Sequence, residues 1–275
     1  MKNIGILFHP KVPATRTKAG EIQDFLKKRG VTAWVCSAWK KETACERADG
    51  ADLIITVGGD GTILRAAQIV APAGIPLVSV NMGKLGFLTE LAAGEALQKL
   101  PDVLEEKSWI DERSMLQVEV SGAEKRKQVF HALNDVVVAR GQIARIIRLE
   151  ASINGKRLAT YRADGVIAAT ATGSTGYALA AGGPILYPGS PDILLVPVAA
   201  HFSLHHSLIL PQEAELKFKL DTYLEATLSV DGHINIALGN GSTVKVKRSP
   251  QKIKFLRLQP RDFFYSTLEA RLKGK

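Results

Sequence analysis

The first hundred residues alternate short apolar runs with longer amphipathic stretches. Short apolar runs predict strands, and stretches with helical periodicity predict helices. Pro101 should divide the last helical stretch or mark a helix start. Strands that are apolar on both faces and alternate with helices indicate a parallel sheet covered by helices. The predicted strands cover residues 4–8, 32–35, 53–57 and 77–80, and the predicted helices cover 17–29, 62–70 and part of 95–106.

The pattern changes after about residue 109. Segments 116–120, 216–220 and 244–247 alternate strictly between apolar and polar positions, which is typical of antiparallel strands with one buried face. The pairs Asn154-Gly155 and Asp231-Gly232 are signals for tight hairpin turns. This part of the chain should therefore be mainly antiparallel β structure.

The two patterns predict two domains, which is also the better expectation for a chain of 275 residues. The first, over residues 1–108, is predicted to be an α/β domain with a Rossmann-like parallel sheet. The second, over residues 109–258, is predicted to be a mainly antiparallel β domain. Residues 259–275 should form a helical tail that could dock back on the first domain.

Composition narrows the possible partners. The formal net charge of +9 favours polyanionic ligands such as nucleotides, but the basic residues are scattered, so no nucleic acid is expected. Cys36 and Cys45 form no CxxC pair, which argues against a disulfide framework and a structural zinc site and fits a reducing cytoplasm. The N-terminal apolar run is too short for a signal peptide, and no run approaches the ~18 residues of a membrane span. We expect a soluble cytoplasmic protein without membrane association.

The run Gly-Gly-Asp-Gly-Thr at residues 58–62 follows an apolar strand and precedes a predicted helix. A glycine turn at a helix N-terminus binds anions, because free N–H groups and the helix dipole point into the turn. Asp60 places a carboxylate in this position, where it would hold a metal ion or accept a proton. That combination favours phosphoryl transfer. Neither GxxxxGK[ST] nor a GxGxxG after a strand is present, so Arg65 is the nearest cation for a phosphate. The alternative is an ordinary glycine turn.

Two further segments could bind a nucleotide. Asn134 and Asp135 separate two apolar runs and could contact a base and a ribose diol, although structural turn residues would look the same. The segment 172–177 is rich in glycine and hydroxyl groups, so a ligand could approach its backbone, with Tyr177 stacking on a ring. A capped helix start is the alternative for that segment.

Charged and histidine residues offer weaker candidates. Asp164 lies two residues from Arg162, where a plain ion pair is the alternative to a ligand contact. His201, His205 and His206 have a spacing that could ligate a metal. No carboxylate accompanies them and the HExxH pattern is missing, so no residue is assigned as a metal ligand.

At this point a family resemblance becomes specific. Residues 57–62 resemble the loop shared by NAD kinases, diacylglycerol- and sphingosine-type lipid kinases and, more distantly, phosphofructokinases. Residues 81–89, the Asn134-Asp135 pair and residues 164–177 resemble further segments of bacterial NAD kinases in the same order and spacing. The resemblance covers nearly the whole chain.

The resemblance implies transfer of the γ-phosphoryl group of ATP to the 2′-hydroxyl of the adenosine ribose of NAD, giving NADP. Asp60 would act as general base beside a divalent cation, expected to be Mg²⁺. Asp164 would contact the nicotinamide end, with Arg162 beside it, and the protein would form a homodimer or homotetramer. The implied substrate-binding residues are Gly59, Gly61, Arg65, Asn134, Asp135, Arg145, Arg162, Asp164, Thr172, Thr175, Gly176, Tyr177, Ala178, Leu179, Ala180 and His233.

Two alternatives remain. A lipid kinase on the same scaffold leaves Asn134 and residues 172–177 unexplained, and a non-catalytic NAD(P)-binding module leaves Asp60 without a purpose. The chain also departs from the family pattern. It lacks the arginine of the usual His-Ser-Leu-Ser-x-Arg-Pro stretch at residues 201–207, and His233 replaces a common glutamine, which could introduce some pH dependence. Sequence leaves open ATP or polyphosphate as donor and NAD or NADH as acceptor.

Overall fold

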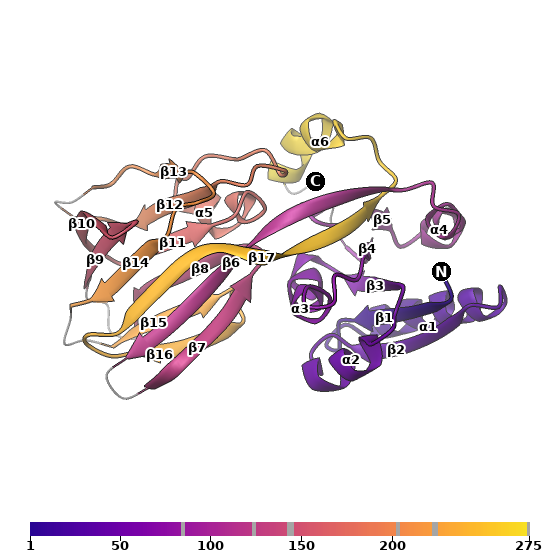
Figure 1. The fold of residues 1–275 in the computed structure, drawn as a ribbon. Coiled ribbons are helices and arrows are strands. Elements are labelled where there is room, and N and C mark those ends of the chain that lie inside the picture. Colours follow the sequence, from indigo (N-terminus) through magenta and orange to yellow (C-terminus); the bar gives the residue numbers. More distant parts are fainter. Residues whose placement is uncertain (84–85, 123–124, 142–145, 202–203, 222–224, 274–275) are drawn as a thin grey trace. The chain divides into compact units, whose positions relative to one another are not determined.

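The computed structural model describes residues 1–83, 86–122, 125–141, 146–201, 204–221 and 225–273 (Figure 1). The chain divides into two compact units, residues 1–112 with 253–275 and residues 113–252. The chain therefore passes between the units twice. The boundaries predicted from the sequence, after residues 108 and 258, fall close to these two passages.

The first unit contains a parallel sheet in the order β2-β1-β3-β4. Every position of β3 is buried, because both faces of the sheet are covered. Ile22 and Leu26 of α1 and Leu100 of α4 pack in one apolar cluster with Ile6 and Ile55 of the sheet. The strands are β1 (Asn3–Phe8), β2 (Thr32–Ser37), β3 (Leu53–Gly58), β4 (Leu77–Asn81) and β5 (Leu91–Ala92), and the helices are α1 (Pro13–Lys27), α2 (Lys41–Ala48), α3 (Asp60–Val70), α4 (Ala96–Leu104) and α6 (Phe263–Leu272).

Local sequence explains most of these elements and two departures. α1 begins at Pro13, earlier than predicted, because proline fits the first turn of a helix. The prediction for Pro101 was wrong: this proline lies inside α4 and neither divides nor begins it. The helix continues through it because Ala96, Leu100 and Val103 form one buried face.

The second unit contains two sheets. The six-stranded sheet runs β13-β12-β11-β8-β15-β16 with antiparallel neighbours throughout. The other places β10, β9, β14 and β17 side by side, with β6 and β7 joined through β17. Their bounds are β6 (Trp109–Gly122), β7 (Lys125–Ala132), β8 (Asp135–Arg140), β9 (Ile147–Ile153), β10 (Lys156–Ala163), β11 (Gly165–Ala169), β12 (Ile193–Val198), β13 (Leu208–Leu210), β14 (Leu216–Leu220), β15 (Ala226–Val230), β16 (Ile234–Leu238) and β17 (Thr243–Arg257).

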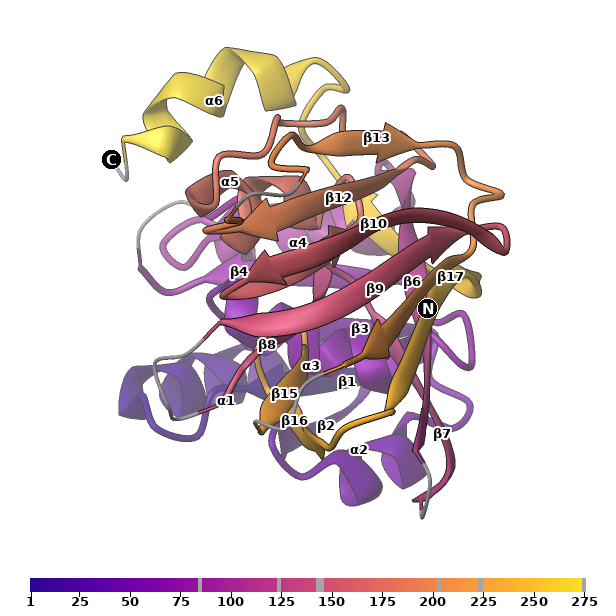
Figure 2. The same ribbon diagram turned by 90° about the vertical axis from the view of Figure 1, so that its left-hand side faces the viewer.

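Both faces of the six-stranded sheet are covered. Val136 and Val138 of β8 belong to a large apolar cluster with Leu149 and Phe218 of the other sheet. On the opposite face, a smaller cluster joins Ala178 to residues of β11 and β12. Figure 2 shows the short helix α5 (Tyr177–Ala180) beside β12. α5 and the 3₁₀ turn η1 (Gly173–Thr175) follow directly after β11.

The predicted fold class is confirmed: a parallel α/β unit is combined with an antiparallel β unit. Both predicted hairpin turns are present, with positive φ at Asn154 and Asp231 and at the glycines that follow them. Within the part of the chain that the structure describes, no helix is both long and apolar enough to cross a membrane.

Candidate active site

The turn from β3 to α3 has the features expected of an anion-binding loop. β3 ends at Gly58 and α3 begins at Asp60. A Cβ at Gly58 would lie 2.3 Å from Thr62 Oγ1, so this close turn requires glycine. Nothing lies within 4 Å of a Cβ built at Gly59 or Gly61, so a ligand could approach their backbone. No described side chain caps the N-terminus of α3, which leaves backbone donors for a phosphate.

The Asp60 carboxylate is held by a second loop, residues 86–90. Phe87 N–H donates to Asp60 Oδ2 at 3.1 Å and Leu88 N–H donates to Oδ1 at 3.3 Å. A Cβ at Gly86 would lie 2.3 Å from Asp60 Oδ1, so only glycine lets this loop pack directly on the carboxylate. Burial raises the pKa of Asp60, and this effect exceeds the opposing effects of the two N–H groups and of Arg271 and Arg257. A carboxylate with a raised pKa is a better proton acceptor.

Arg65 is oriented by an aromatic side chain. Its guanidinium lies over the Trp39 ring, 4.3 Å from the centroid, and His9 meets the same ring edge-on at 4.3 Å. His9 follows β1 and Trp39 follows β2, so both come from the carboxyl edge of the parallel sheet. Ligands of open α/β sheets bind at that edge. Burial lowers the pKa of Arg65.

In the second unit, the Asn134-Asp135 segment is held by a buried aspartate that sequence reasoning missed. Asp231 Oδ1 accepts the N–H groups of Asn134 at 2.7 Å and Asp135 at 3.2 Å, and its Oδ2 accepts that of Leu133 at 2.9 Å. Burial raises the pKa of Asp231 to about 7, with the nearby Asp135 carboxylate adding to the rise and the three N–H groups opposing it. Burial also raises the pKa of Asp135 to about 6. The only sequence signal at Asp231 was its place in an Asp-Gly turn.

The glycine-rich segment after β11 packs on the same residues. Thr170 N–H donates to the Asn134 carbonyl at 2.9 Å, and a Cβ at Gly173 would lie 2.0 Å from that oxygen. A Cβ at Gly176 would lie 3.9 Å from Asp135 Oδ2. Asn134 Oδ1 is buried and has no hydrogen-bond partner among the described residues. An unsatisfied buried acceptor is the feature expected where a ligand donates a hydrogen bond.

The hydroxyl groups of this segment already bond within the protein. Thr172 Oγ1 accepts from Arg113 Nη1 at 3.3 Å, and Thr175 Oγ1 donates to the Thr172 carbonyl at 3.1 Å. Tyr177 is 47% exposed at the start of α5, so its ring is available for stacking. Ala178 beneath it is buried, Leu179 is half-buried and Ala180 is exposed.

Asp164 has a different partner from the one considered in the sequence. It forms an ion pair with Arg140 Nε at 3.0 Å, because β8 and β11 are neighbours. Arg162 is exposed on β10 and lines a cavity of about 520 Å³ with Arg148 and Arg157. Arg145 lies outside the described residues.

The candidate histidines His233, His205 and His206 have different neighbours. His233 Nδ1 lies 3.0 Å from the carbonyl oxygen of Asp231, two residues earlier in the same turn. The rings of His205 and His206 are 4.0 Å apart. In the described ranges, no group of three or more His, Cys, Asp or Glu side chains could hold a metal ion.

Comparison with known proteins matches both units to one family. Residues 14–108 match the ATP-NAD kinase N-terminal domain, and residues 133–258 match the ATP-NAD kinase C-terminal domain. The chain is 45% identical over 276 residues to an NAD kinase of Dehalococcoides mccartyi strain CBDB1, covering 99% of this chain and 96% of the relative. It is 39% identical over 275 residues to an NAD kinase of Chloroflexus aurantiacus strain J-10-fl, covering 99% of each.

Solved structures agree with these matches. Yeast NADH kinase complexed with NADH superposes with a TM-score of 0.88 at 26% identity, over 99% of this chain and 88% of that one. An NAD kinase from Archaeoglobus fulgidus in complex with ATP superposes with a TM-score of 0.80 at 24% identity, over 99% of each chain. At that identity, the second likeness shows the fold.

Proposed function

The chain belongs to the NAD kinase family and has NAD kinase activity with ATP as phosphoryl donor, and on this premise we propose that Asp60 is the general base of the reaction. In this reaction the 2′-hydroxyl of the adenosine ribose of NAD attacks the γ-phosphorus of ATP, and NADP and ADP leave. The comparisons give no support to a lipid kinase or to a non-catalytic binding module.

The observation that carries the proposal is the way Asp60 is held. Its carboxylate lies in the first turn of an uncapped helix and accepts two backbone N–H groups at 3.1 and 3.3 Å. Phosphoryl transfer depends mostly on positioning and charge stabilisation, so a base fixed by the backbone suits the task. Burial raises its pKa, which increases its affinity for the hydroxyl proton.

The proposed acceptor site lies in the second unit. The unsatisfied Asn134 Oδ1 would accept a hydrogen bond from the adenine, and the Asp135 carboxylate would bind ribose hydroxyls. Tyr177 would stack on a ring of the dinucleotide. The remaining members of this site follow the family resemblance and are Arg145, Arg162, Asp164, Thr172, Thr175, Gly176, Ala178, Leu179, Ala180 and His233.

The proposed donor site is the loop after β3. The N–H groups at Gly59 and Gly61 would bind phosphate oxygens, and Arg65 would add a positive charge. Mg²⁺ is usually held by one or two carboxylates together with substrate phosphates. This mode needs no three-residue ligand group, and the described residues hold none, so the ATP phosphates at this loop would supply the main ligands and leave Asp60 to accept the proton. A divalent cation bound there would neutralise charge on the transferring phosphoryl group.

The family resemblance further supports a homodimer or homotetramer, measurable by light scattering coupled to size-exclusion chromatography. A cytoplasmic location is also proposed. Cys36 and Cys45 are both free, which fits a reducing compartment.

The test is an NADP-formation assay with Mg²⁺ and either ATP or polyphosphate, on the wild type and on Asp60→Asn. General-base help is typically ~10²–10⁴-fold, so the variant should lose about that factor in kcat with ATP. Its NAD affinity should stay within about threefold of the wild type. A variant with wild-type kcat would remove Asp60 from the chemistry.

A further inference from the structure

The loop at residues 86–90 connects Asp60 to a cationic side chain of the C-terminal helix. Arg271 Nη1 donates to the Phe87 carbonyl at 3.0 Å. That carbonyl belongs to the same peptide group as the Leu88 N–H, which donates to Asp60 Oδ1 at 3.3 Å. A cation bound to a peptide carbonyl polarises the group and strengthens donation by its N–H. Arg271 therefore acts on Asp60 through one peptide group.

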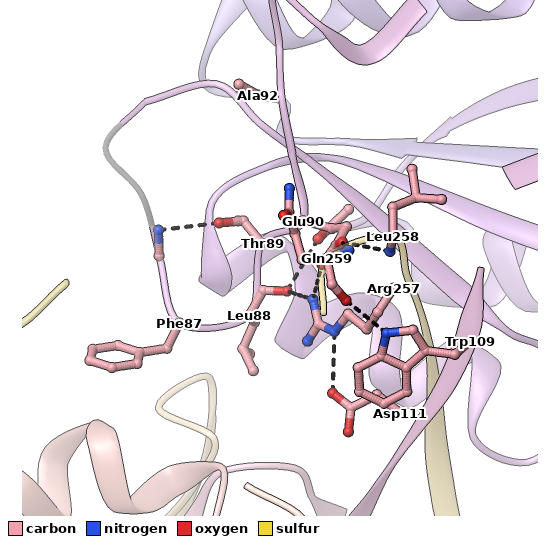
Figure 3. A network of polar contacts seen from close by, with 12 residues as sticks. Phe87, Leu88, Thr89, Glu90, Ala92, Trp109, Asp111, Arg257, Leu258 and Gln259 are labelled. Carbon is pink, nitrogen blue, oxygen red and sulfur yellow. Dashed lines mark hydrogen bonds and ion pairs between the residues drawn. The ribbon is translucent and has the colours of Figure 1, made fainter. Parts of the chain in front are cut away.

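A second arginine holds the next carbonyl of the loop (Figure 3). Arg257 Nη1 donates to the Leu88 carbonyl at 2.9 Å and to Glu90 Oε2 at 3.1 Å. Arg257 Nε donates to Asp111 Oδ2 at 3.2 Å. Because the guanidinium is planar and its donors have fixed directions, these bonds orient the Leu88 carbonyl, which also accepts a hydrogen bond from Ser79 Oγ at 3.2 Å.

Glu90 ties the same loop to the two passages of the chain between the units. Its Oε1 accepts the N–H groups of Leu258 at 2.7 Å and Gln259 at 2.9 Å. The Gln259 carbonyl in turn accepts the Trp109 indole N–H at 2.7 Å. Residues 109–111 and 257–259 lie next to the points where the chain crosses from one unit to the other. The loop that holds Asp60 is thus bonded to both passages (Figure 3).

Stability alone does not account for this network. The side chains of Arg257, Glu90 and Asp111 are 8%, 4% and 12% exposed. Removing ions from water costs several kcal/mol each, and buried pairs return little net stability compared with apolar residues of similar volume. What the network does provide is a fixed position for the Leu88 carbonyl, and with it for the N–H groups on Asp60.

We propose that Arg257 and Arg271 are positioning residues for the phosphoryl transfer, which hold the Phe87 and Leu88 N–H groups against the Asp60 carboxylate. The inference rests on the proposed role of Asp60 as general base. Both arginines act through the loop, and neither contacts the reacting atoms. A misplacement of about 1 Å can cost roughly 10²-fold in rate, so losing either contact should lower turnover. NAD affinity should stay unchanged, because the residues proposed to bind NAD belong to the second unit.

The experiment is a double-mutant cycle with Asp60. Arg257→Gln, Arg257→Lys and Arg271→Gln are each made in the wild type and in Asp60→Asn, and kcat with ATP and Mg²⁺ is measured beside the NAD dissociation constant. In the wild-type background, the glutamine variants should lose about 10–100-fold in kcat, with NAD affinity within about threefold. Arg257→Lys keeps the positive charge but lacks the planar guanidinium with its fixed donor directions, so its kcat should fall less than that of Arg257→Gln. In the Asp60→Asn background, the same changes should alter kcat by less than about twofold.

Arg261→Gln is the matched control, since Arg261 follows the same segment and lies over the Trp109 ring at 4.7 Å, exposed to solvent. It should leave kcat unchanged. If the arginine changes lower kcat by the same factor with and without Asp60, the positioning role is overturned while the base is retained. If Asp60→Asn turns over at the wild-type rate, the general-base proposal itself fails. If thermal melting shows that Arg257→Gln does not fold, the double-mutant cycle of Arg271→Gln with Asp60→Asn tests the positioning role, because Arg271 lies at the end of α6.

Discussion

The first unit contains Asp60 and the second contains Asp231, and each carboxylate accepts backbone N–H groups from a loop distant in sequence. Their surroundings differ. Asp60 is only partly buried and is faced by the cations Arg271 and Arg257. Asp231 is 6% exposed, accepts three N–H groups and is faced by another carboxylate, Asp135. The same bonding pattern therefore holds the proposed catalytic carboxylate in the first unit, whereas in the second unit the carboxylate itself holds the Asn134-Asp135 segment.

The comparison also shows what each loop presents. Around Asp60 the loop is the support and the carboxylate is the proposed catalytic group. Around Asp231 the carboxylate is the support and the loop presents Asn134 and Asp135. Changes at the two places should therefore affect different steps, turnover in the first unit and NAD binding in the second.

The largest difference between an effect on kcat and an effect on NAD binding is expected when one glycine in each unit is replaced by alanine. In Gly86→Ala the new Cβ would lie 2.3 Å from Asp60 Oδ1, so the carboxylate must move and kcat should fall about 10²-fold. In Gly173→Ala the Cβ would lie 2.0 Å from the Asn134 carbonyl oxygen, so the NAD dissociation constant should rise about tenfold or more. Steady-state kinetics and calorimetry measure the two quantities.

Gly20→Ala is the control for both, because nothing lies within 4 Å of a Cβ at Gly20 in α1. It should leave kinetics unchanged and slightly stabilise the helix. If Gly86→Ala weakened NAD binding and kept its turnover, the assignment of functions to the two units would be reversed.

The second prediction concerns how the free energy of unfolding changes with pH. The ordinary carboxyl pKa of 3.8 is raised to about 7 in folded Asp231. Between these values the folded protein binds more protons than the unfolded chain, so the free energy of unfolding should fall as pH rises through this window. The contribution of protonated Asp231 to the free energy of unfolding is lost above its folded pKa and amounts to roughly 1–4 kcal/mol.

Urea denaturation at several pH values from about 5 to 8 tests this by comparing the wild type with Asp231→Asn, which cannot ionise. The wild type should lose more stability than the variant as pH rises. Asp60→Asn should change the slope less, because the N–H groups of Phe87 and Leu88, and after them Arg271 and Arg257, offset part of the effect of burial on the pKa of Asp60. Parallel slopes for wild type and Asp231→Asn would mean that Asp231 keeps an ordinary pKa.

The smallest effect is expected at the edge of the acceptor site. Tyr177 is 47% exposed, and its proposed stacking on NAD is worth about 0.5–1.5 kcal/mol, or roughly three- to tenfold in affinity. Tyr177→Ala should weaken NAD binding by that factor and leave kcat nearly unchanged. Tyr265→Ala, at a tyrosine 61% exposed on α6, is the control. Equal NAD affinity in both variants would remove Tyr177 from the site.

Much of the fold could be predicted because the strands of the first unit are continuous apolar runs and several strands of the second unit alternate between apolar and polar positions. β3 is buried at all six positions, and its sequence pattern already shows this. α2 went unpredicted because its buried residues are only Ala44 and Ala48, too small to give a clear amphipathic pattern. Pro101 was misjudged because packing of the buried face of α4 outweighs the local preference.

Candidate functional groups could be picked out from the sequence where a motif is continuous, as at Asp60. The residues that hold these groups in place could not be predicted. Arg257 and Glu90 are 167 residues apart, and Asp231 and Asn134 are 97 residues apart. Neither pair has a local sequence signal. Asp231 in particular precedes a glycine, and an aspartate before glycine is typical of an exposed turn. The Arg140 partner of Asp164 likewise follows only from the pairing of β8 with β11.

The most direct test measures two constants on two variants side by side: the single-turnover rate constant at saturating NAD and ATP, and the NAD dissociation constant, for Asp60→Asn and Asp231→Asn. Asp60→Asn should lose about 10²–10⁴-fold in rate with nearly normal NAD affinity. Asp231→Asn should lose about 10–100-fold in NAD affinity and keep most of its rate. A contradiction would be the same constant changing by the same factor in both variants, or a wild-type rate in Asp60→Asn.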